Sequence, residues 1–207
     1  MTAIILGAIL IVIYILFLLW YYNFPKPLTK EEVERYISIL EKRSGDPGKG
    51  INSIATAFRK FGDEDDGKQF FMCNLVKYHE KAQYTDGDRG LTSKEANLRY
   101  ARNTMPLLLS RACHPYGLFR PVINLRQADS YWDEVNIVRY RSRRDLLSMI
   151  TSEKWYAGYG DKQAALSENP NFPSKAFVAF PIIPVLVFTI LLLVGIIGIA
   201  CMYFKPF

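Results

Sequence analysis

The sequence predicts an α+β domain held between two transmembrane α-helices. Two long apolar segments without a charged side chain, residues 2–22 and 180–203, lie near the ends of the chain. Between them, apolar patterns follow the order strand, helix, strand, strand, helix. We therefore divide the chain into a first transmembrane helix at 1–23, a juxtamembrane helix and long loop at 24–68, an α+β domain at 69–178, and a second transmembrane helix with a short tail at 179–207.

Each apolar segment is long enough to cross the hydrocarbon core of a bilayer. The first covers 21 residues and the second 24, whereas a spanning helix needs roughly 20. No basic region or small-residue cleavage pattern marks the first segment as a removable signal peptide. Basic residues cluster between the spans, and only Lys205 lies beyond the second one. We expect a two-pass protein of the inner cell membrane, with both termini outside and the central domain cytoplasmic.

Small residues within the spans indicate faces for helix packing, because they let two backbones approach closely. An ordinary lipid-facing composition explains the same pattern equally well. The candidate packing residues are Ala3 and Gly7 in the first span and Gly195, Gly198 and Ala200 in the second.

The segment after the first span begins with a helix and continues into a long excursion. Thr29 and Glu32 form a capping box ahead of an apolar stripe at helical spacing. Residues 44–68 are rich in Gly and Asp and contain one short amphipathic piece with Phe58 and Phe61. Because long loops with a helix of their own are often contact sites, we predict that these two rings meet a partner or lipid.

The clearest strand is 70–78, which is apolar on both faces. Phe71, Cys73 and Leu75 point one way, and the alternate residues, including Asn74, point the other way. We expect helices on one face and a second sheet on the other. The elements predicted after it are a helix at 94–112 kinked by Pro106, strands at 118–126 and 134–140, a helix capped by Ser142 and a helical segment around Trp155. Residues 175–180 are the only candidate for a last strand, and because they run directly into the second span, a strand and a plain connection fit them equally well. This order is that of a split βαβ, ferredoxin-like unit.

Four groups of residues carry a resemblance to a known family. They are 28–29 with 72–78, 100–102 with 106–108, 132–135 with 138–143 and 146–149, and 154–156 with 162–166. Over about residues 69–168, the chain resembles the DUF1330-like members of the dimeric α+β barrel superfamily. The resemblance implies a ferredoxin-like dimeric α+β barrel domain, with helices on one sheet face and a second copy on the other. Most such domains have no assigned activity, although the wider superfamily includes small oxygenases, haem-degrading enzymes and isomerases. The two spans and the 44–68 excursion depart from the soluble family pattern.

The sequence offers a loose set of catalytic candidates. An oxygenase-like interpretation places Asn74, His114, Trp132 and Trp155 in one pocket. Each of these residues also fits a structural role, as a satisfied amide, a core ring or a loop residue. The histidines and cysteines lack metal-ligand spacing, so we predict no metal and no cofactor. Further candidates for lining the pocket are Lys77, Tyr78, Tyr100 and Tyr156.

The part between the spans is basic. It holds all 20 acidic residues and 25 of the 26 basic ones. Its densest basic cluster, which we call the arginine cluster, suits anionic lipid or an acidic protein surface, and the alternative is a solvated face. The sequence lacks the interleaved basic and aromatic residues that are typical of nucleic-acid binding. The arginine cluster consists of Arg139, Arg141, Arg143 and Arg144.

These patterns favour a non-catalytic accessory or structural subunit that stabilises a larger integral membrane complex, such as an energy-transducing respiratory or photosynthetic assembly. The expected partners are membrane lipid, other integral membrane subunits and a second copy through the open sheet face, with no nucleic acid. The alternative is a membrane-tethered small-molecule enzyme or ligand sensor that uses the barrel pocket. A subunit should tolerate Asn74→Ala and fail when a span becomes polyleucine, whereas an enzyme should show the reverse.

Overall fold

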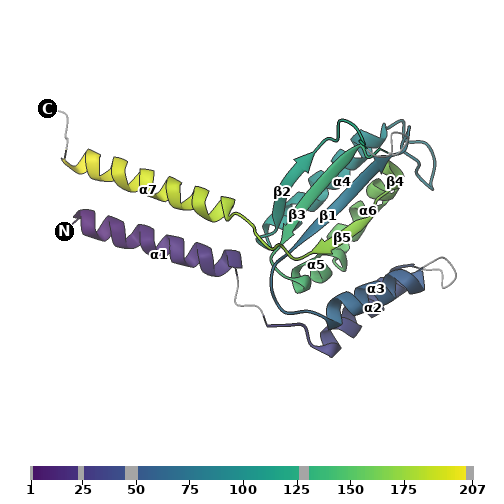
Figure 1. Cartoon of the computed structure of the whole chain (residues 1–207), viewed down its shortest axis with the longest axis horizontal. Helices are drawn as coiled ribbons and strands as arrows, with labels where there is room; N and C mark the ends of the chain where they lie inside the picture. The colour runs from purple at the N-terminus through teal and green to yellow at the C-terminus, as the bar shows by residue number, and fades with distance from the viewer. Residues whose placement is uncertain (1, 23–25, 45–50, 126–130, 204–207) are drawn as a thin grey trace. The chain divides into compact units, whose positions relative to one another are not determined.

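The computed structural model describes residues 2–22, 26–44, 51–125 and 131–203 (Figure 1). The chain divides into two compact units, residues 25–175 and a helical unit formed by the two ends. In chain order the elements are α1 (Thr2–Tyr22), α2 (Lys30–Ser44), α3 (Ile51–Asp63), β1 (Phe70–Tyr78), α4 (Ser93–Leu109), β2 (His114–Phe119), β3 (Glu134–Tyr140), α5 (Arg143–Ile150), α6 (Glu153–Ala165), β4 (Leu166–Glu168), β5 (Asn171–Ser174) and α7 (Ile182–Tyr203).

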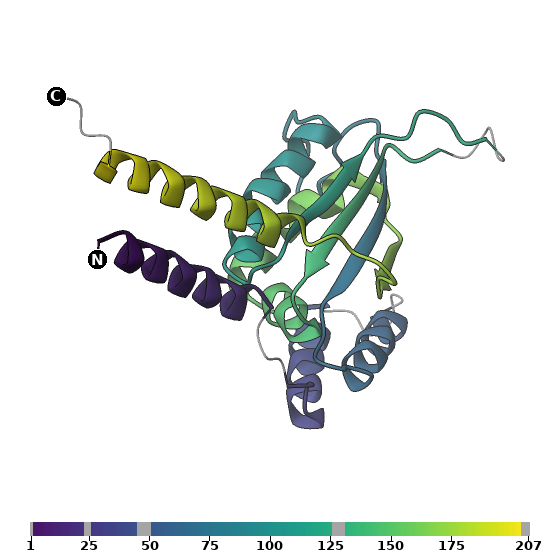
Figure 2. The same ribbon diagram turned by 60° about the vertical axis from the view of Figure 1, so that its left-hand side comes forward.

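The helical unit consists of α1 and α7, which lie side by side in both views (Figures 1 and 2). Tyr14 donates from its hydroxyl to the carbonyl oxygen of Pro184 at 3.3 Å, and its ring centroid lies 5.5 Å from that of Phe188. With 21 and 22 residues, both helices are long and apolar enough to cross a membrane. Length and composition show no more than this, because a signal sequence or a core helix passes the same test.

Glycines of α7 set the approach of the two helices. A Cβ atom added at Gly198 would stand 2.8 Å from Cδ2 of Leu6, and one at Gly195 would stand 3.1 Å from Cδ1 of Leu10. At Gly7 an added Cβ would meet nothing within 4 Å. The close approach therefore depends on the α7 glycines, while Gly7 has free space. The two candidate alanines, Ala3 and Ala200, are partly buried.

The 25–175 unit is an α+β fold, as the sequence predicted. Five strands form an antiparallel sheet in the order β2-β3-β1-β4, with β5 also paired to β1. The β1–β3 register runs from Phe70 opposite Tyr140 to Val76 opposite Glu134. β1 and β3 have the predicted bounds, whereas β2 lies at 114–119 rather than 118–126. Pro121 has no amide hydrogen to donate, and residues 120–125 lead away from the sheet (Figure 2).

The candidate strand at 175–180 does not form. The β1 edge is already occupied, because β4 and β5 pair there through residues 166–168 and 171–174. Pro173 fits β5, an edge strand where the missing donor is tolerated. Beyond it, Phe177 and Phe180 are exposed on the way to α7. Of the two interpretations of 175–180, the connecting segment is therefore the one found, because residues 166–174 already pair with the edge of β1.

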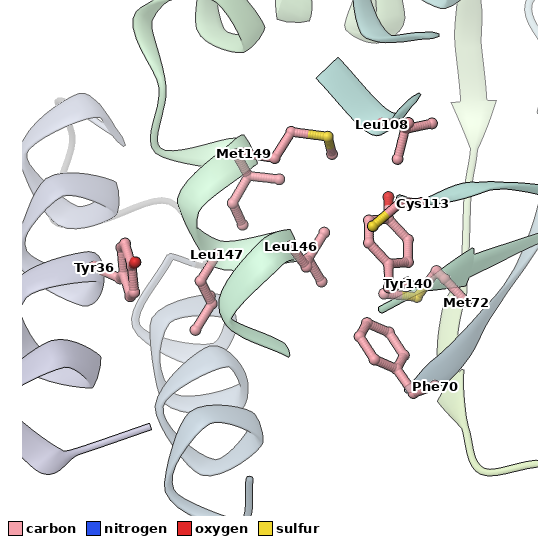
Figure 3. Packing of buried hydrophobic residues seen from close by; sticks show 10 residues of the cluster. Tyr36, Phe70, Met72, Leu108, Cys113, Tyr140, Leu146, Leu147 and Met149 are labelled. Atoms are coloured by element: carbon pink, nitrogen blue, oxygen red, sulfur yellow. The ribbon is translucent and has the colours of Figure 1, made fainter. Parts of the chain in front are cut away.

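The main core lies on the helix-facing side of β1. Phe70 and Tyr140 stack with ring centroids 5.2 Å apart, and Met72 continues the same side (Figure 3). α5 covers them with Leu146 and Met149, whose exposed fractions are 5% and 1% (Figure 3). This side corresponds to the alternation predicted from the sequence, since Phe70 and Met72 share one face of a strand.

A hairpin of α2 and α3 packs beside this core. The predicted capping box forms, because the Thr29 amide donates to Glu32 Oε2 at 2.9 Å and the Glu32 amide donates to Thr29 Oγ1 at 3.2 Å. Val33 and Ile37 are fully buried between the two helices. Tyr36 belongs to the main core and joins the hairpin to the domain (Figure 3).

Candidate functional site

Polar side chains occupy the helix-facing side of the sheet beyond the main core. Asn74 Nδ2 donates to the backbone oxygens of Met72 and Asn136 at 3.2 and 3.1 Å. Asn136, opposite it on β3, donates to Glu134 Oε2 at 3.1 Å. The amide nitrogen of Asn74 is therefore used within the sheet, as in a structural asparagine.

Tyr78 continues this side at the end of β1. Its hydroxyl oxygen accepts a hydrogen bond from Asn97 Nδ2 on α4 at 2.8 Å. Burial raises the pKa of Tyr78, and the neighbouring carboxylate of Glu134 raises it further. The phenol therefore stays protonated and bridges the sheet to α4.

Tyr100, one turn after Asn97, contacts aromatic residues of α6. Trp155 Nε1 donates to the Tyr100 hydroxyl at 3.2 Å, and the Trp155 ring stacks on Tyr159 with centroids 4.7 Å apart. Burial raises the pKa of both tyrosines. We call Tyr100, Trp155 and Tyr159 the aromatic cluster.

Lys162 lies one turn beyond Tyr159 and faces the same cluster. Its Nζ is 5.7 Å from the centroid of the Tyr100 ring, within the range of a cation–π contact. Burial lowers the pKa of Lys162 to about 8. No carboxylate of the described residues forms an ion pair with it, because the adjacent Asp161 pairs with Arg99 at 3.6 Å. The site therefore holds a partly exposed lysine side chain against an aromatic face.

Half of the eight predicted pocket residues lie in this interior. Lys77 points to the other sheet face, where its Nζ pairs with Glu168 at 3.0 Å. Tyr156 is exposed on α6, with the Arg43 guanidinium 4.7 Å from its ring centroid. Neither residue lines the interior. The four that do are Asn74, Tyr78, Tyr100 and Trp155.

His114 and Trp132 lie elsewhere, so the oxygenase-like set is not assembled. His114 pairs across β2–β3 with Arg139, on the sheet face opposite Asn74. Its Nδ1 is 2.8 Å from the carbonyl oxygen of Pro115, and burial lowers its pKa. Trp132 lines a surface hollow of about 540 Å³ formed mainly by residues 121–125.

Two arginines of the arginine cluster hold the α2–α3 hairpin. Arg144 donates to the backbone oxygens of Lys26 and Pro27 at 2.9 and 3.2 Å, and its Nη2 lies 2.8 Å from Glu32 Oε2. Arg143 Nε lies 3.8 Å from Asp65 Oδ1, and these two side chains are 11% and 1% exposed. Both guanidinium groups therefore bind groups of the same chain.

The other two arginines are also engaged. Arg139 is 2% exposed and donates to the Gln69 side chain and to the backbone oxygen of Ala112. Arg141 pairs with Asp145 at 2.7 Å, a contact that raises the pKa of Arg141. All four arginines of the cluster therefore have partners within the fold. Phe58 and Phe61 likewise pack against the core.

One loop joins both ends of the 25–175 unit. The Leu28 amide donates to Asp65 Oδ2 at 2.9 Å. Lys175 Nζ lies 2.8 Å from Asp66 Oδ2, and this bond lowers the pKa of Asp66. The Asp65–Asp66 loop therefore fixes the chain where it enters and where it leaves the unit.

Comparison with known proteins supports the fold. No family model matches the chain, and no curated protein matches it, so the DUF1330-like resemblance is not confirmed. A crystal structure of RPA0582, a protein of unknown function from Rhodopseudomonas palustris, is similar with a TM-score of 0.55 and 24% identity, over 65% of this chain and 97% of that one. A crystal structure of methylated RPA0582 gives 0.57 and 25%, over 64% and 94%. The likeness is one of antiparallel α+β folds.

Proposed function

We propose that the chain is a non-catalytic accessory subunit of a larger integral membrane complex, anchored by α1 and α7 as two membrane spans. The observation that carries this proposal is the helix pair itself. The helices contact one another through Gly195 and Gly198, while apolar residues on their other sides are exposed, including Ile4 at 78% and Ile197 at 61%. Such a pair suits a lipid environment, where small residues permit packing and apolar side chains face acyl chains.

We propose a two-pass topology with both termini outside and the 25–175 unit in the cytoplasm. The basic residues between the two helices support it, because positive loops stay on the cytoplasmic side. A cysteine introduced at the exposed Asp86 should react with a bulky maleimide in inside-out vesicles and stay protected in right-side-out vesicles. Reaction of the right-side-out vesicles only would overturn this topology.

We further infer that the 25–175 unit is a ferredoxin-like dimeric α+β barrel domain whose open sheet face meets a second copy. Two observations support the inference. The strand order β2-β3-β1-β4 is that of a split βαβ unit. On the side of the sheet away from the main core, Phe119 and Phe172 are 55% and 52% exposed. A second apolar sheet would cover these rings.

Native isolation tests the subunit proposal. The protein is extracted from its membranes in a mild detergent without crosslinking, and its companions are counted by native electrophoresis and mass spectrometry. Companions in fixed ratio are the expected result. Recovery as a lone monomer or homodimer with both helices folded would contradict the proposal.

A matched pair of variants links the assembly to the helix pair. Gly198→Val places atoms against Leu6 and should reduce the yield of companions, whereas Gly7→Val enters free space and should leave it unchanged. Equal yields from the two variants would show that the α1–α7 contact does not support assembly.

A further inference from the structure

The segment between β5 and α7 exposes apolar side chains although it belongs to no helix or strand. Residues 176–181, which we call the linker, contain no charged or hydrogen-bonding side chain. Phe177 and Val178 are 107% and 79% exposed, so the described chain leaves both almost uncovered, and Phe180 is exposed as well. Adjacent apolar side chains that are exposed together mark a surface that meets lipid or another protein.

The helix pair fixes where the linker begins. Contacts along α1 fall at progressively earlier residues of α7, so the two helices run antiparallel. The close approach of Leu10 to Gly195 gives a common reference point. At about 1.5 Å per residue, α1 ends at Tyr22 about 18 Å beyond this point, and α7 begins at Ile182 about 20 Å beyond it. The two helices therefore end at the same level, and the linker leaves the pair there.

The surroundings of the linker follow from the proposed role of α7 as a membrane span, on which this proposal rests. A helix of 22 residues is about 33 Å long, which covers a hydrocarbon core of about 30 Å. The headgroup layer then adds roughly 5–7 Å on each side. Beyond the linker the chain is already held by the folded unit, because Lys175 pairs with Asp66. The six residues of the linker therefore pass through the headgroup layer.

The linker suits this layer better than the hydrocarbon core or bulk water. Outside a helix or strand, its backbone lacks the regular hydrogen bonds that the hydrocarbon core requires. In water, the side chains of Phe177 and Val178 would stay exposed, at a cost that grows with their apolar area. The headgroup layer supplies water for the backbone and lipid for the side chains. Trp20 and Tyr22, of residue types enriched at this level, are exposed at the same end of the helix pair.

We propose that the linker binds the headgroup layer of the bilayer, with Phe177 and Val178 inserted between lipid molecules. Together with Trp20 and Tyr22, it forms an aromatic belt at the end of the helix pair that is joined to the 25–175 unit. The belt fixes the depth of α7, because a shift outward exposes the rings to water and a shift inward carries irregular backbone into the hydrocarbon core. A polar protein surface fits less well, since the linker offers no charge and no side-chain donor.

Photo-crosslinking identifies the molecule that touches the linker. The full-length protein is reconstituted into phosphatidylcholine vesicles with the photoreactive analogue p-benzoylphenylalanine at Phe177, and mass spectrometry identifies the product. Two reference positions carry the same analogue, Leu193 in the middle of α7 and Phe172 on β5, each 52% exposed. A product heavier by one phosphatidylcholine molecule is expected at Phe177 and at Leu193. At Phe172, which lies on the open sheet face, this lipid product should be absent.

The reference positions separate a failure of this proposal from a failure of the membrane role. Lipid at Leu193 but not at Phe177 would overturn the proposal and leave α7 as a span. Absence of lipid at Leu193 would contradict the span itself and overturn the proposal with it. A link from Phe177 to a second copy, or an equal yield of lipid product at Phe172, would also overturn the proposal. Val178, where the same lipid product is expected, provides a second variant in case the first does not fold.

Discussion

Arg144 on α5 and Glu32 on α2 form a two-point ion pair, with Nη2 2.8 Å from Oε2 and Nε 3.1 Å from Oε1. The same guanidinium binds the backbone oxygens of Lys26 and Pro27. One side chain therefore joins the start of the 25–175 unit, the first turn of α2 and the first turn of α5. A member of the arginine cluster therefore connects three parts of the same fold.

Replacing Arg144 with Met should loosen the α2–α3 hairpin. The two side chains of the pair are 32% and 26% exposed, so solvent screens part of their attraction, and we expect a loss of about 1 kcal/mol in the free energy of unfolding. Hydrogen exchange of α2 amides should quicken, while Arg102→Met, at an exposed position on α4, should leave exchange unchanged. Unchanged exchange in Arg144→Met would contradict the role assigned to it.

At low pH, the contacts made by Glu32 and Asp66 should be lost before the main core unfolds. Arg144 lowers the pKa of Glu32 below 4.5, and Lys175 lowers the pKa of Asp66 below 3.8. A carboxyl group whose pKa is depressed by folding adds stability above its unfolded pKa, and this stability is lost as the pH falls through the folded value. The protection factors of the amides at Leu28 and around residue 175, which correct for the slower intrinsic exchange in acid, should therefore fall as the pH falls below these ordinary values. Glu32→Gln and Asp66→Asn together should remove most of this dependence.

Gly158 permits the close crossing of α4 and α6. A Cβ atom there would collide with the side-chain amide of Asn103, which donates to the Lys154 backbone oxygen at 2.8 Å. Gly158→Ala should therefore lower the melting temperature, although alanine by itself favours a helix by about 1 kcal/mol. In an Asn103→Ala background the collision is relieved, so the same change should cost less or stabilise. Identical shifts in both backgrounds would exclude the collision.

Leu147 tests the main core. The side chain is fully buried on the side of α5 that faces Tyr36 of α2, and its removal leaves a cavity (Figure 3). We expect Leu147→Ala to lower the free energy of unfolding by about 2–5 kcal/mol, the usual cost of such a truncation. Leu98→Ala, at a residue 48% exposed on α4, serves as the control. A loss in Leu147→Ala no greater than in the control would contradict this core assignment.

Local sequence patterns predicted the elements that depend on near neighbours. The Phe70–Tyr78 strand, the Thr29–Glu32 capping box and the Ser142 cap all appear, because each is decided by alternation or by contacts within one turn. The position of the last strand depends on which residues reach the distant edge of β1. That information lies outside any local pattern.

The difference between local and long-range contacts also explains which residues of the candidate site were predicted. Asn74 was chosen for its place on a strand, but its hydrogen bonds depend on the backbone of β3. Asn97, Tyr159 and Lys162 were missed as site residues. The spacing of Trp155, Tyr159 and Lys162 by four and three residues was the available signal, because it places all three on one side of a helix. Their meeting with Tyr100 depends on the packing of α4 against α6.

The Asp65–Asp66 loop holds the two ends of the 25–175 unit close together, as in a domain that can be inserted into another chain. The chain enters it at Leu28 and leaves it at Lys175, and both ends are bound to neighbouring carboxylates. Domains whose ends lie close together tolerate insertion into a host chain, because the host need not stretch to accommodate them. The unit should therefore fold when grafted into an exposed loop of an unrelated protein, and excising it should leave two segments that a short linker can rejoin.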